Sequence, residues 1–333
     1  MDEQNEKREE GTSFLQYAIW AGIVLVGFFI LKNLFFSAPR NQDINRMVPT
    51  DMKVRMQPIV KSTSTDKVAV ISVYGIIGMP GLTEKLTAEL RSASQDPEVK
   101  AVILRVDSPG GGVHDTDLIH REILKYKSSK KPLIAFFNGV AASAAYYISA
   151  PADKIMATPA TVTGSIGVIA QFPNYSGLMD KLGVKMHTIK SGAQKDMMSP
   201  YRPLDPEGEK ILQAWINESY DEFVRVVATG RKMEVETIRQ LADGRIYTAR
   251  QAQKNHLVDS LGYFEDAVDL AKKLGNCPNA AVMEMNAFDM RMGSIFERMR
   301  SDFLKASNPI GRMILPAGIY YIAPEFSQKY LDR

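Results

Sequence analysis

Cysteine is almost absent from this sequence, because Cys277 is the only one in 333 residues. A single cysteine excludes an internal disulfide framework, and no Cys/His cluster has the spacing of a zinc site. Histidine is scarce too, and none lies between His120 and His187. The formal net charge of +3 is too small to indicate nucleic-acid binding. We therefore expect no metal and no nucleic-acid partner.

Nucleotide-binding signatures are missing as well. The glycine-rich segment DSPGGG at residues 107–112 is not followed by Lys-Ser/Thr and lacks the GxGxxG spacing, so it does not predict a phosphate-binding loop. Its glycines allow the backbone to approach a substrate closely and to point N–H groups into a cleft, as an oxyanion hole requires. A plain tight turn is the alternative interpretation.

One long hydrophobic run is present near the N-terminus. Residues 14–31 contain Gln16 as their only strongly polar side chain, and residues 34–36 extend the run. At about 1.5 Å per residue such a helix nearly spans a bilayer core of about 30 Å, so residues 14–36 predict a transmembrane anchor. The polar, acidic tail at residues 1–13 argues against a cleaved signal peptide, and a buried core helix is the alternative. The basic residues around the run weakly favour a cytoplasmic C-terminus.

The rest of the chain predicts one α/β domain. Residues 37–65 carry Pro39, Pro49, Pro58 and a Ser/Thr run, which predicts a linker, and the folded domain is expected at 66–275. Apolar, β-branched runs alternate with apolar residues at helical spacing, which indicates a largely parallel sheet. Strands are predicted at residues 67–74, 100–106, 132–137, 154–157, 166–170 and 184–189. Helices are predicted at residues 82–93, around 119–124, at 205–228 closed by Gly230, and at 237–242, 249–255 and 264–273.

The C-terminal extension, residues 278–333, gives no functional signal. Its apolar stretch at residues 313–323 is interrupted by Pro316 and Gly318 and is too short to span a membrane. We expect this stretch to dock on its own domain or on a partner.

The strongest candidate for chemistry is Ser143. It follows the predicted strand at 132–137 and stands in the small-residue segment AASAAYYIS, at a strand-to-helix junction. Unsatisfied N–H groups at such a junction favour developing negative charge, and the neighbouring alanines leave room for another chain. A small-residue helix that packs tightly against a neighbour, with Ser143 merely tolerated, is the alternative.

A base for Ser143 is less obvious. His114 follows the glycine-rich segment and is one candidate, and Lys195 in KSGAQKD is the better one. A lysine acts as a general base only where burial disfavours its ammonium form, and Asp196 would oppose this if it faced the same way. A solvated surface lysine is the common alternative. Ser165 in TVTGSIG could accept a hydrogen bond from the amine and orient it.

Taken in order, these motifs resemble the signal peptide peptidase SppA family over residues 68–273. The segments that carry the resemblance are RVDSPGGG, AASAAYYIS, TGSIGV, KSGAQKDMMSPYR and GRIYTARQAQKNHLVDSLG. The resemblance implies the fold shared by Clp-type proteases and crotonases, with repeated strand–strand–helix units. It implies that Ser143 is the nucleophile, Lys195 the general base and Ser165 the residue that orients the lysine. The backbone N–H groups of Gly111 and Ala144 would form the oxyanion hole.

Two positions depart from the family pattern. Ala144 and Ala145 stand where glycines often follow the nucleophile, and Ala249 stands where glycine is usual. The first difference could narrow the approach to Ser143, and the second lies away from the predicted site.

The resemblance also implies a function. We expect a membrane-bound serine endopeptidase with a Ser–Lys dyad and no cofactor, which degrades cleaved signal peptides and other extended hydrophobic peptides. Its domain is expected on the extracytoplasmic side of the bacterial inner membrane, in a ring- or dome-shaped homo-oligomer such as an octamer, with sites shared between subunits. The alternatives are a catalytically silent membrane scaffold of the same fold and a crotonase-like acyl-CoA enzyme.

Overall fold

The computed structural model describes residues 52–289 and 318–322. The predicted N-terminal tail and transmembrane anchor, residues 1–13 and 14–36, lie outside this range. Within the described residues no helix combines the length and the apolar character that crossing a bilayer requires.

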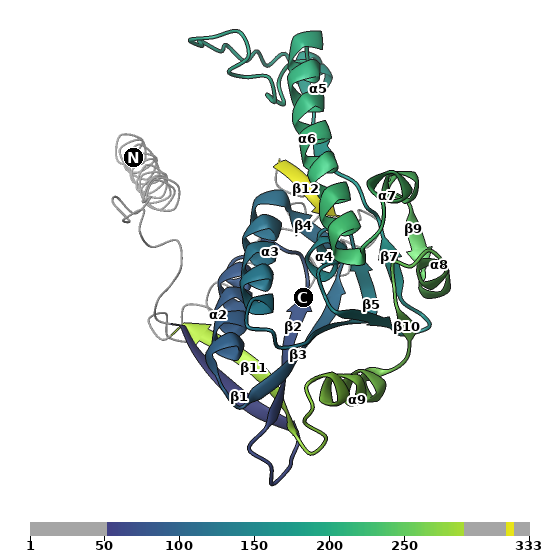
Figure 1. The fold of residues 1–333 in the computed structure, drawn as a ribbon. Coiled ribbons are helices and arrows are strands. Elements are labelled where there is room, and N and C mark those ends of the chain that lie inside the picture. Colours follow the sequence, from purple (N-terminus) through teal and green to yellow (C-terminus); the bar gives the residue numbers. More distant parts are fainter. Residues whose placement is uncertain (1–51, 290–317, 323–333) are drawn as a thin grey trace, which may run out of the picture. The chain divides into compact units, whose positions relative to one another are not determined.

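The centre of the fold is a mixed β-sheet (Figure 1). Its strand order is β1-β11-β2-β3-β5-β6-β10, with β7 beside β5 and β9 beside β7. The pairs between β11 and β10 in this order are parallel, as is β5–β7, whereas β1–β11 and β7–β9 are antiparallel. The strands are β1 Met52–Val60, β2 Lys67–Tyr74, β3 Val99–Ser108, β5 Leu133–Ala142, β6 Lys154–Ala157, β7 Val162–Gly164, β9 Ile246–Thr248, β10 Ser260–Leu261 and β11 Ala281–Asp289.

Helices cover both faces of this sheet because the central strands are apolar on both sides. In β2, Ile71 and Val73 belong to a cluster with α2, α3 and α4, whereas Val68 and Val70 belong to a second cluster with α9. The alternation follows from the two-residue repeat of a strand. The helices are α2 Leu82–Gln95, α3 Val113–Lys127, α4 Ala144–Ser149, α5 Ser176–Lys181, α6 Pro206–Arg231, α7 Val235–Leu241, α8 Ala249–Lys254 and α9 Phe264–Leu274.

Most of the predicted elements are present, including the strands at 67–74 and 154–157 with the bounds expected. The predicted strand at 184–189 is wrong, because these residues have no regular structure. Gly230 does not end the long helix; α6 continues to Arg231, and Lys232 follows it with a left-handed φ of 55°. A Cβ atom on Gly230 would lie 2.3 Å from the carbonyl oxygen of Ala150, so the glycine serves close packing rather than termination.

The folded part reaches further in both directions than predicted. Residues 52–60, inside the range expected for the linker, form β1 and pair with β11. β11 lies beyond residue 275, the predicted end of the domain, and pairs in parallel with β2. A strand from each side of the predicted domain therefore completes the sheet.

A separate three-stranded sheet lies beside the main one. It consists of β4 (Gly110–Gly112), β12 (Gly318–Ile322) and β8 (Ile169–Gln171), with β12 in the middle and both pairings antiparallel. The predicted strand at 166–170 thus begins later, at Ile169. Residues 318–322 of the apolar C-terminal stretch dock on the chain's own domain, as one of the two expected outcomes.

Candidate active site

Ser143 lies where β5 ends and α4 begins. Its φ of 56° and ψ of −119° turn the chain sharply, in a region that side chains other than glycine rarely adopt. The turn is held because the Ser143 N–H donates to the carbonyl of Gly164 at 2.8 Å and its own carbonyl accepts from the N–H of Tyr147 at 2.9 Å. The Ser143 Oγ is buried and has no hydrogen-bond partner within the described residues. A buried hydroxyl that forms no hydrogen bond costs stability and is uncommon in folded proteins, which makes Ser143 a candidate functional residue.

The structure brings Ser165 next to Ser143. β5 and β7 run parallel with Ala142 paired to Gly164, so Ser143 and Ser165 are the residues that follow this pair. Neighbouring strands lie about 4.8 Å apart, which places the two serines side by side. Ser165 is mostly buried and has a φ of 49°, and its N–H donates to the carbonyl of Arg245 at 2.8 Å.

Gly164, between these two serines, has no room for a side chain. Its φ is 84°, and a Cβ atom there would lie 2.5 Å from Cδ2 of Tyr247 and 3.0 Å from the carbonyl oxygen of Arg245. Tyr247 is fixed in turn because its hydroxyl donates to the carbonyl of Leu241 at 2.8 Å. Arg245 and Tyr247 support the site but were not predicted as site residues, although the segment that contains them was part of the resemblance.

The glycine-rich segment forms the short strand β4 rather than a plain tight turn. Ile77 occupies one edge of β4: its N–H donates to the carbonyl of Gly110 at 2.8 Å, and its carbonyl accepts from the N–H of Gly112 at 2.9 Å. Successive backbone groups of a strand point to opposite edges, so the N–H and C=O of Gly111 face away from Ile77. A Cβ atom on Gly111 would lie 1.8 Å from the carbonyl oxygen of Ile77, which excludes any other residue. No sequence signal pointed to Ile77.

The structure does not bring Lys195 to the two serines. Lys195 lies in the arm, which we define as residues 172–205, and the arm projects beyond the sheet together with the first half of α6 (Figure 1). The Lys195 side chain is exposed. Within the described residues, no hydrogen bond or ion pair joins it to Ser143 or Ser165.

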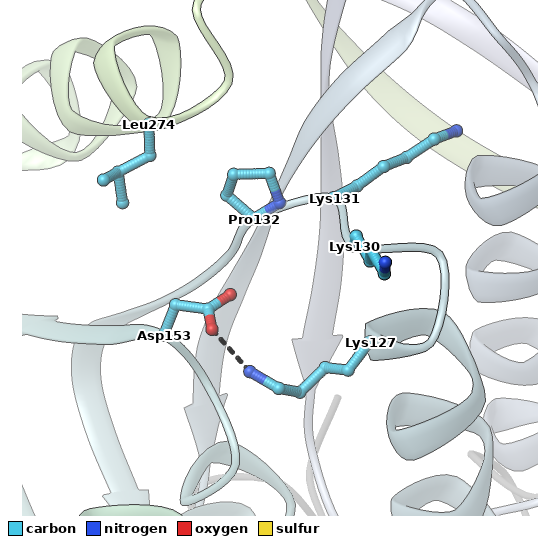
Figure 2. Close-up of a pocket in the computed structure, with 6 residues that line it drawn as sticks. All are labelled: Lys127, Lys130, Lys131, Pro132, Asp153 and Leu274. Atoms are coloured by element: carbon cyan, nitrogen blue, oxygen red, sulfur yellow. Dashed lines mark hydrogen bonds and ion pairs between the residues drawn. The ribbon is translucent and has the colours of Figure 1, made fainter.

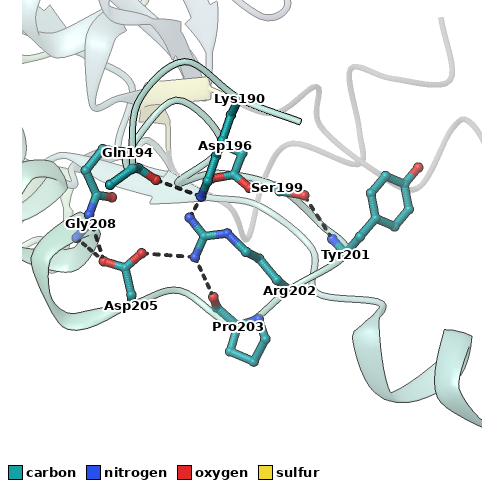
Figure 3. A network of polar contacts seen from close by, with 10 residues as sticks. Lys190, Gln194, Asp196, Ser199, Tyr201, Arg202, Pro203, Asp205 and Gly208 are labelled. Atoms are coloured by element: carbon teal, nitrogen blue, oxygen red, sulfur yellow. Dashed lines mark hydrogen bonds and ion pairs between the residues drawn. The ribbon is translucent and has the colours of Figure 1, made fainter. Parts of the chain in front are cut away.

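The carboxylate beside Lys195 is occupied by other cations (Figure 3). Asp196 Oδ1 accepts from Arg202 Nη2 at 2.9 Å and from Lys190 Nζ at 2.7 Å, and these bonds hold the pKa of Asp196 below its ordinary value. Arg202 also binds Asp205 at 3.0 Å, which ties the arm to the start of α6. Asp196 therefore serves the internal structure of the arm, and Lys190 is one of its partners.

A hollow adjoins Ser165. Its volume is about 530 Å³, and it lies between β8, α6 and the residues before β9. Its lining includes Ser165, Val168, Ile169, Ile216, Tyr220 and Ala242. Asn217 and Asp243 also line it, so the hollow offers both apolar and polar surface beside a candidate catalytic serine.

Other candidate positions contribute nothing to this site. His114 is exposed in the first turn of α3.

The pocket in Figure 2 is lined by three lysines. Lys127 is paired with Asp153 at 2.6 Å. Lys131 Nζ donates to the carbonyls of Ala93, Ser94 and Asp96 near the end of α2. Within residues 52–289 and 318–322, no group of His, Cys, Asp and Glu could hold a metal ion.

Comparison with known proteins places the chain among proteases. The family described as "Peptidase family S49" matches residues 125–277, and the family described as "Clp protease" matches residues 59–163. The second match agrees with the mixed α/β architecture, which is that of a Clp-protease-like fold.

Several curated proteins are similar to this chain. The "Putative signal peptide peptidase SppA" of Enterococcus faecium is 42% identical over 72% of this chain and 73% of its own length. The "Serine protease SPPA, chloroplastic" of Arabidopsis thaliana is 35% identical over 62% of this chain, but only 31% of its own length is covered. Among solved structures, a point mutant of ClpP1 from Listeria monocytogenes aligns with a TM-score of 0.41 and 20% identity, over 60% of this chain and 94% of that one. On the sequence relationships, the chain belongs to peptidase family S49, the signal peptide peptidase SppA family, and is a serine protease.

Proposed function

We propose that the protein is a membrane-bound endopeptidase in which Ser143 is the nucleophile, Lys195 the general base and Ser165 the residue that orients the lysine amine. The observation that carries this proposal is the buried Ser143 Oγ, which stands unpaired at a turned strand-to-helix junction beside Ser165. Because this hydroxyl forms no hydrogen bond among the described residues, its reaction with a substrate breaks none.

The chemistry then follows in four steps. The neutral amine of Lys195 takes the proton of Ser143 as Oγ attacks the peptide carbonyl. The N–H groups of Gly111 and Ala144 stabilise the oxyanion, and Ala144, as the first residue of α4, has no intrahelical acceptor for its N–H. The ammonium of Lys195 protonates the leaving amine. Water then hydrolyses the acyl-enzyme and restores the serine.

Lys195 would reach Ser143 from a neighbouring subunit. In the part of the chain that the structure describes, the arm exposes large apolar side chains, and a second copy of the chain would bury both them and the lysine. These side chains are Leu178, Leu182, Val184, Met186 and Ile189. A contact that joins the arm of one subunit to the serine of the next is heterologous, and such contacts form a ring where the rotation between subunits closes. The assembly that we propose is a closed ring, for which an octamer is one size.

We also propose the substrates and the cellular location. Extended hydrophobic peptides, including cleaved signal peptides, would place apolar side chains against Val168, Ile169 and Ile216 in the hollow beside Ser165. Residues 14–36 would anchor the chain, with the protease domain on the periplasmic side of the inner membrane. Protease added to spheroplasts should then degrade the domain and spare residues 1–13. If the whole domain survived until lysis, the orientation would be the opposite one, which the charge count favours.

A fluorophosphonate probe should form an adduct on Ser143. The probe reacts with an activated serine hydroxyl, and peptide mapping by mass spectrometry locates it. Ser149→Ala is the matched control, because Ser149 lies on α4 but its Oγ is occupied by a 2.7 Å hydrogen bond to the Ala145 carbonyl. We expect Ser149→Ala to label and Ser143→Ala not to label. Absence of labelling in the wild-type protein would instead favour a silent scaffold or an acyl-CoA enzyme.

A further inference from the structure

Strand β5 contains a bulge shortly before the candidate nucleophile. The pairing of β3 with β5 shifts register within residues 106–108 of β3, so Asp107 alone stands opposite three residues of β5, residues 138–140. Before the bulge β5 pairs with β6, and after it β5 pairs with β7, the strand that leads to Ser165. A bulge bends its strand and can redirect a side chain. This one redirects β5 so that Ser143 arrives beside the second serine of the site.

The side chain of Asp107 holds the bulge in place. Its Oδ1 accepts a hydrogen bond at 3.0 Å from the N–H of Val140, a donor that a regular ladder would direct to a backbone carbonyl. Gly139 has a φ of 113°, and a Cβ atom there would lie 2.9 Å from the same oxygen. Val140 is also the first residue of β5 that pairs with β7. The hydrogen bond therefore fixes the start of the segment that ends at Ser143.

Asp107 is connected to the glycine-rich segment as well. Its carbonyl accepts at 3.2 Å from the N–H of Gly75, at the start of the loop that carries Ile77. Ile77 in turn bonds to Gly110 and Gly112, the two ends of β4, on either side of the proposed oxyanion donor. One residue thus contacts the segment that leads to the nucleophile through its side chain, and the loop that supports the oxyanion donor through its backbone.

We propose that Asp107 is a positioning residue, whose carboxylate sets the place of Ser143 relative to the oxyanion hole. This inference rests on the proposed function, because it takes Ser143 as the nucleophile and the Gly111 N–H as an oxyanion donor. A misplacement of reacting groups by about 1 Å can lower the rate about 10²-fold. The carboxylate acts through Val140 and not on the substrate, so its removal should lower kcat and leave KM nearly unchanged.

Three substitutions of Asp107 test the inference in the full-length protein. Asp107→Asn keeps an oxygen acceptor in place, Asp107→Ala removes it, and Asp107→Glu moves the carboxylate one methylene further. We expect Asp107→Ala to lower kcat about 10²-fold and Asp107→Glu at least about tenfold, with KM within about threefold of wild type. Asp107→Asn should keep kcat within about threefold of wild type. Equal kcat values in all three variants would overturn the inference.

A transition-state analogue gives a second measure of the same effect. A peptide boronate forms a tetrahedral adduct with the serine and places an oxygen in the oxyanion hole. Its inhibition constant should rise about 10²-fold in Asp107→Ala, in parallel with the loss of kcat, and stay near the wild-type value in Asp107→Asn. An unchanged inhibition constant in Asp107→Ala would contradict a role in placing the nucleophile against the oxyanion donors.

Asp153→Ala is the matched control for a loss of stability. Asp153 Oδ2 accepts from the N–H of Leu133 at 2.8 Å, so the same type of hydrogen bond occurs at the opposite end of β5. We expect Asp153→Ala to lower the midpoint of thermal unfolding, as Asp107→Ala does, but to keep kcat within about threefold of wild type. If Asp153→Ala lost kcat to the same extent as Asp107→Ala, the effect would be one of stability alone and the inference would fail.

Hydrogen exchange separates this inference from the proposed catalytic roles. The amide of Val140 reports its bond to Asp107 whether or not the protein is active. We expect exchange at least about tenfold faster in Asp107→Ala, and wild-type exchange in Asp107→Asn. If Ser143 labels with fluorophosphonate but Val140 exchanges equally in all variants, the positioning inference fails alone. If exchange rises in Asp107→Ala while Ser143 of the wild-type protein does not label, the positioning bond stands and the assignment of the nucleophile fails.

Discussion

Replacing Ser143 with alanine should lower kcat/KM by at least about 10³-fold, because the residue that forms the covalent intermediate is lost. The fold should not suffer. The hydroxyl is buried without a hydrogen-bond partner among the described residues, so its removal relieves a desolvation cost instead of breaking a bond. We therefore expect the midpoint of thermal unfolding to stay equal to that of the wild-type protein or to rise. Hydrolysis of a fluorogenic peptide and a circular-dichroism melt measure the two effects.

Ser149→Ala is the control for this experiment. The Ser149 Oγ donates to the carbonyl of Ala145 four residues earlier, so its loss should cost about 1 kcal/mol of unfolding free energy and leave activity within a few-fold of wild type. Ser143→Ala should therefore be inactive but as stable as the wild-type protein, whereas Ser149→Ala should be active but less stable. Near-normal turnover in Ser143→Ala would refute the assignment of the nucleophile.

Lys195→Ala should lose activity to a similar extent. Mixed assemblies of Lys195→Ala and Ser143→Ala chains, each inactive alone, should regain part of the activity. In a ring with shared sites, one subunit supplies Ser143 and its neighbour supplies Lys195. Random mixing of equal amounts of Ser143→Ala and Lys195→Ala chains gives an intact serine in half of the positions and an intact lysine in half of the neighbours. About a quarter of the wild-type activity should therefore return.

The mixing experiment has its own controls. Lys185→Ala alters another exposed lysine of the arm and should remain active. Native mass spectrometry shows whether mixed assemblies have formed after dissociation and reassembly. Mixed assemblies without activity would mean that each subunit makes its own site. An active Lys195→Ala protein together with an inactive His114→Ala protein would assign the base to the histidine.

The central elements could be predicted because local signals agreed with the final packing. β2 is a β-branched run bounded by polar residues, and α2 begins at Leu82 and ends before Asp96-Pro97. In contrast, the turn at Ser143 has no local signal, because serine does not mark a positive φ as glycine does. The order of the motifs pointed to Ser143 and Ser165, but only the pairing of β5 with β7 puts them side by side.

The wrong predictions at residues 184–189 and 52–60 have one physical cause. A β-strand forms only where a neighbouring strand accepts and donates its backbone hydrogen bonds. Residues 184–187 alternate apolar and polar side chains, but they lie in the arm, where Val184 and Met186 are exposed and no neighbouring strand is available among the described residues. Conversely, β1 lies in a proline-containing segment that predicted a linker, and it forms because β11 offers an edge. Local periodicity cannot report a partner that lies so far away in the sequence.

The place of β1 has a consequence for solubility. It is the last strand in the sheet order, so its outer backbone groups form no ladder within the described part of the chain and could template the addition of another polypeptide. Two features of the strand oppose such aggregation. Lys53 and Arg55 are exposed along it and repel a second copy, and Pro58 withholds a backbone donor. The strand that completes the sheet thus also protects its open edge.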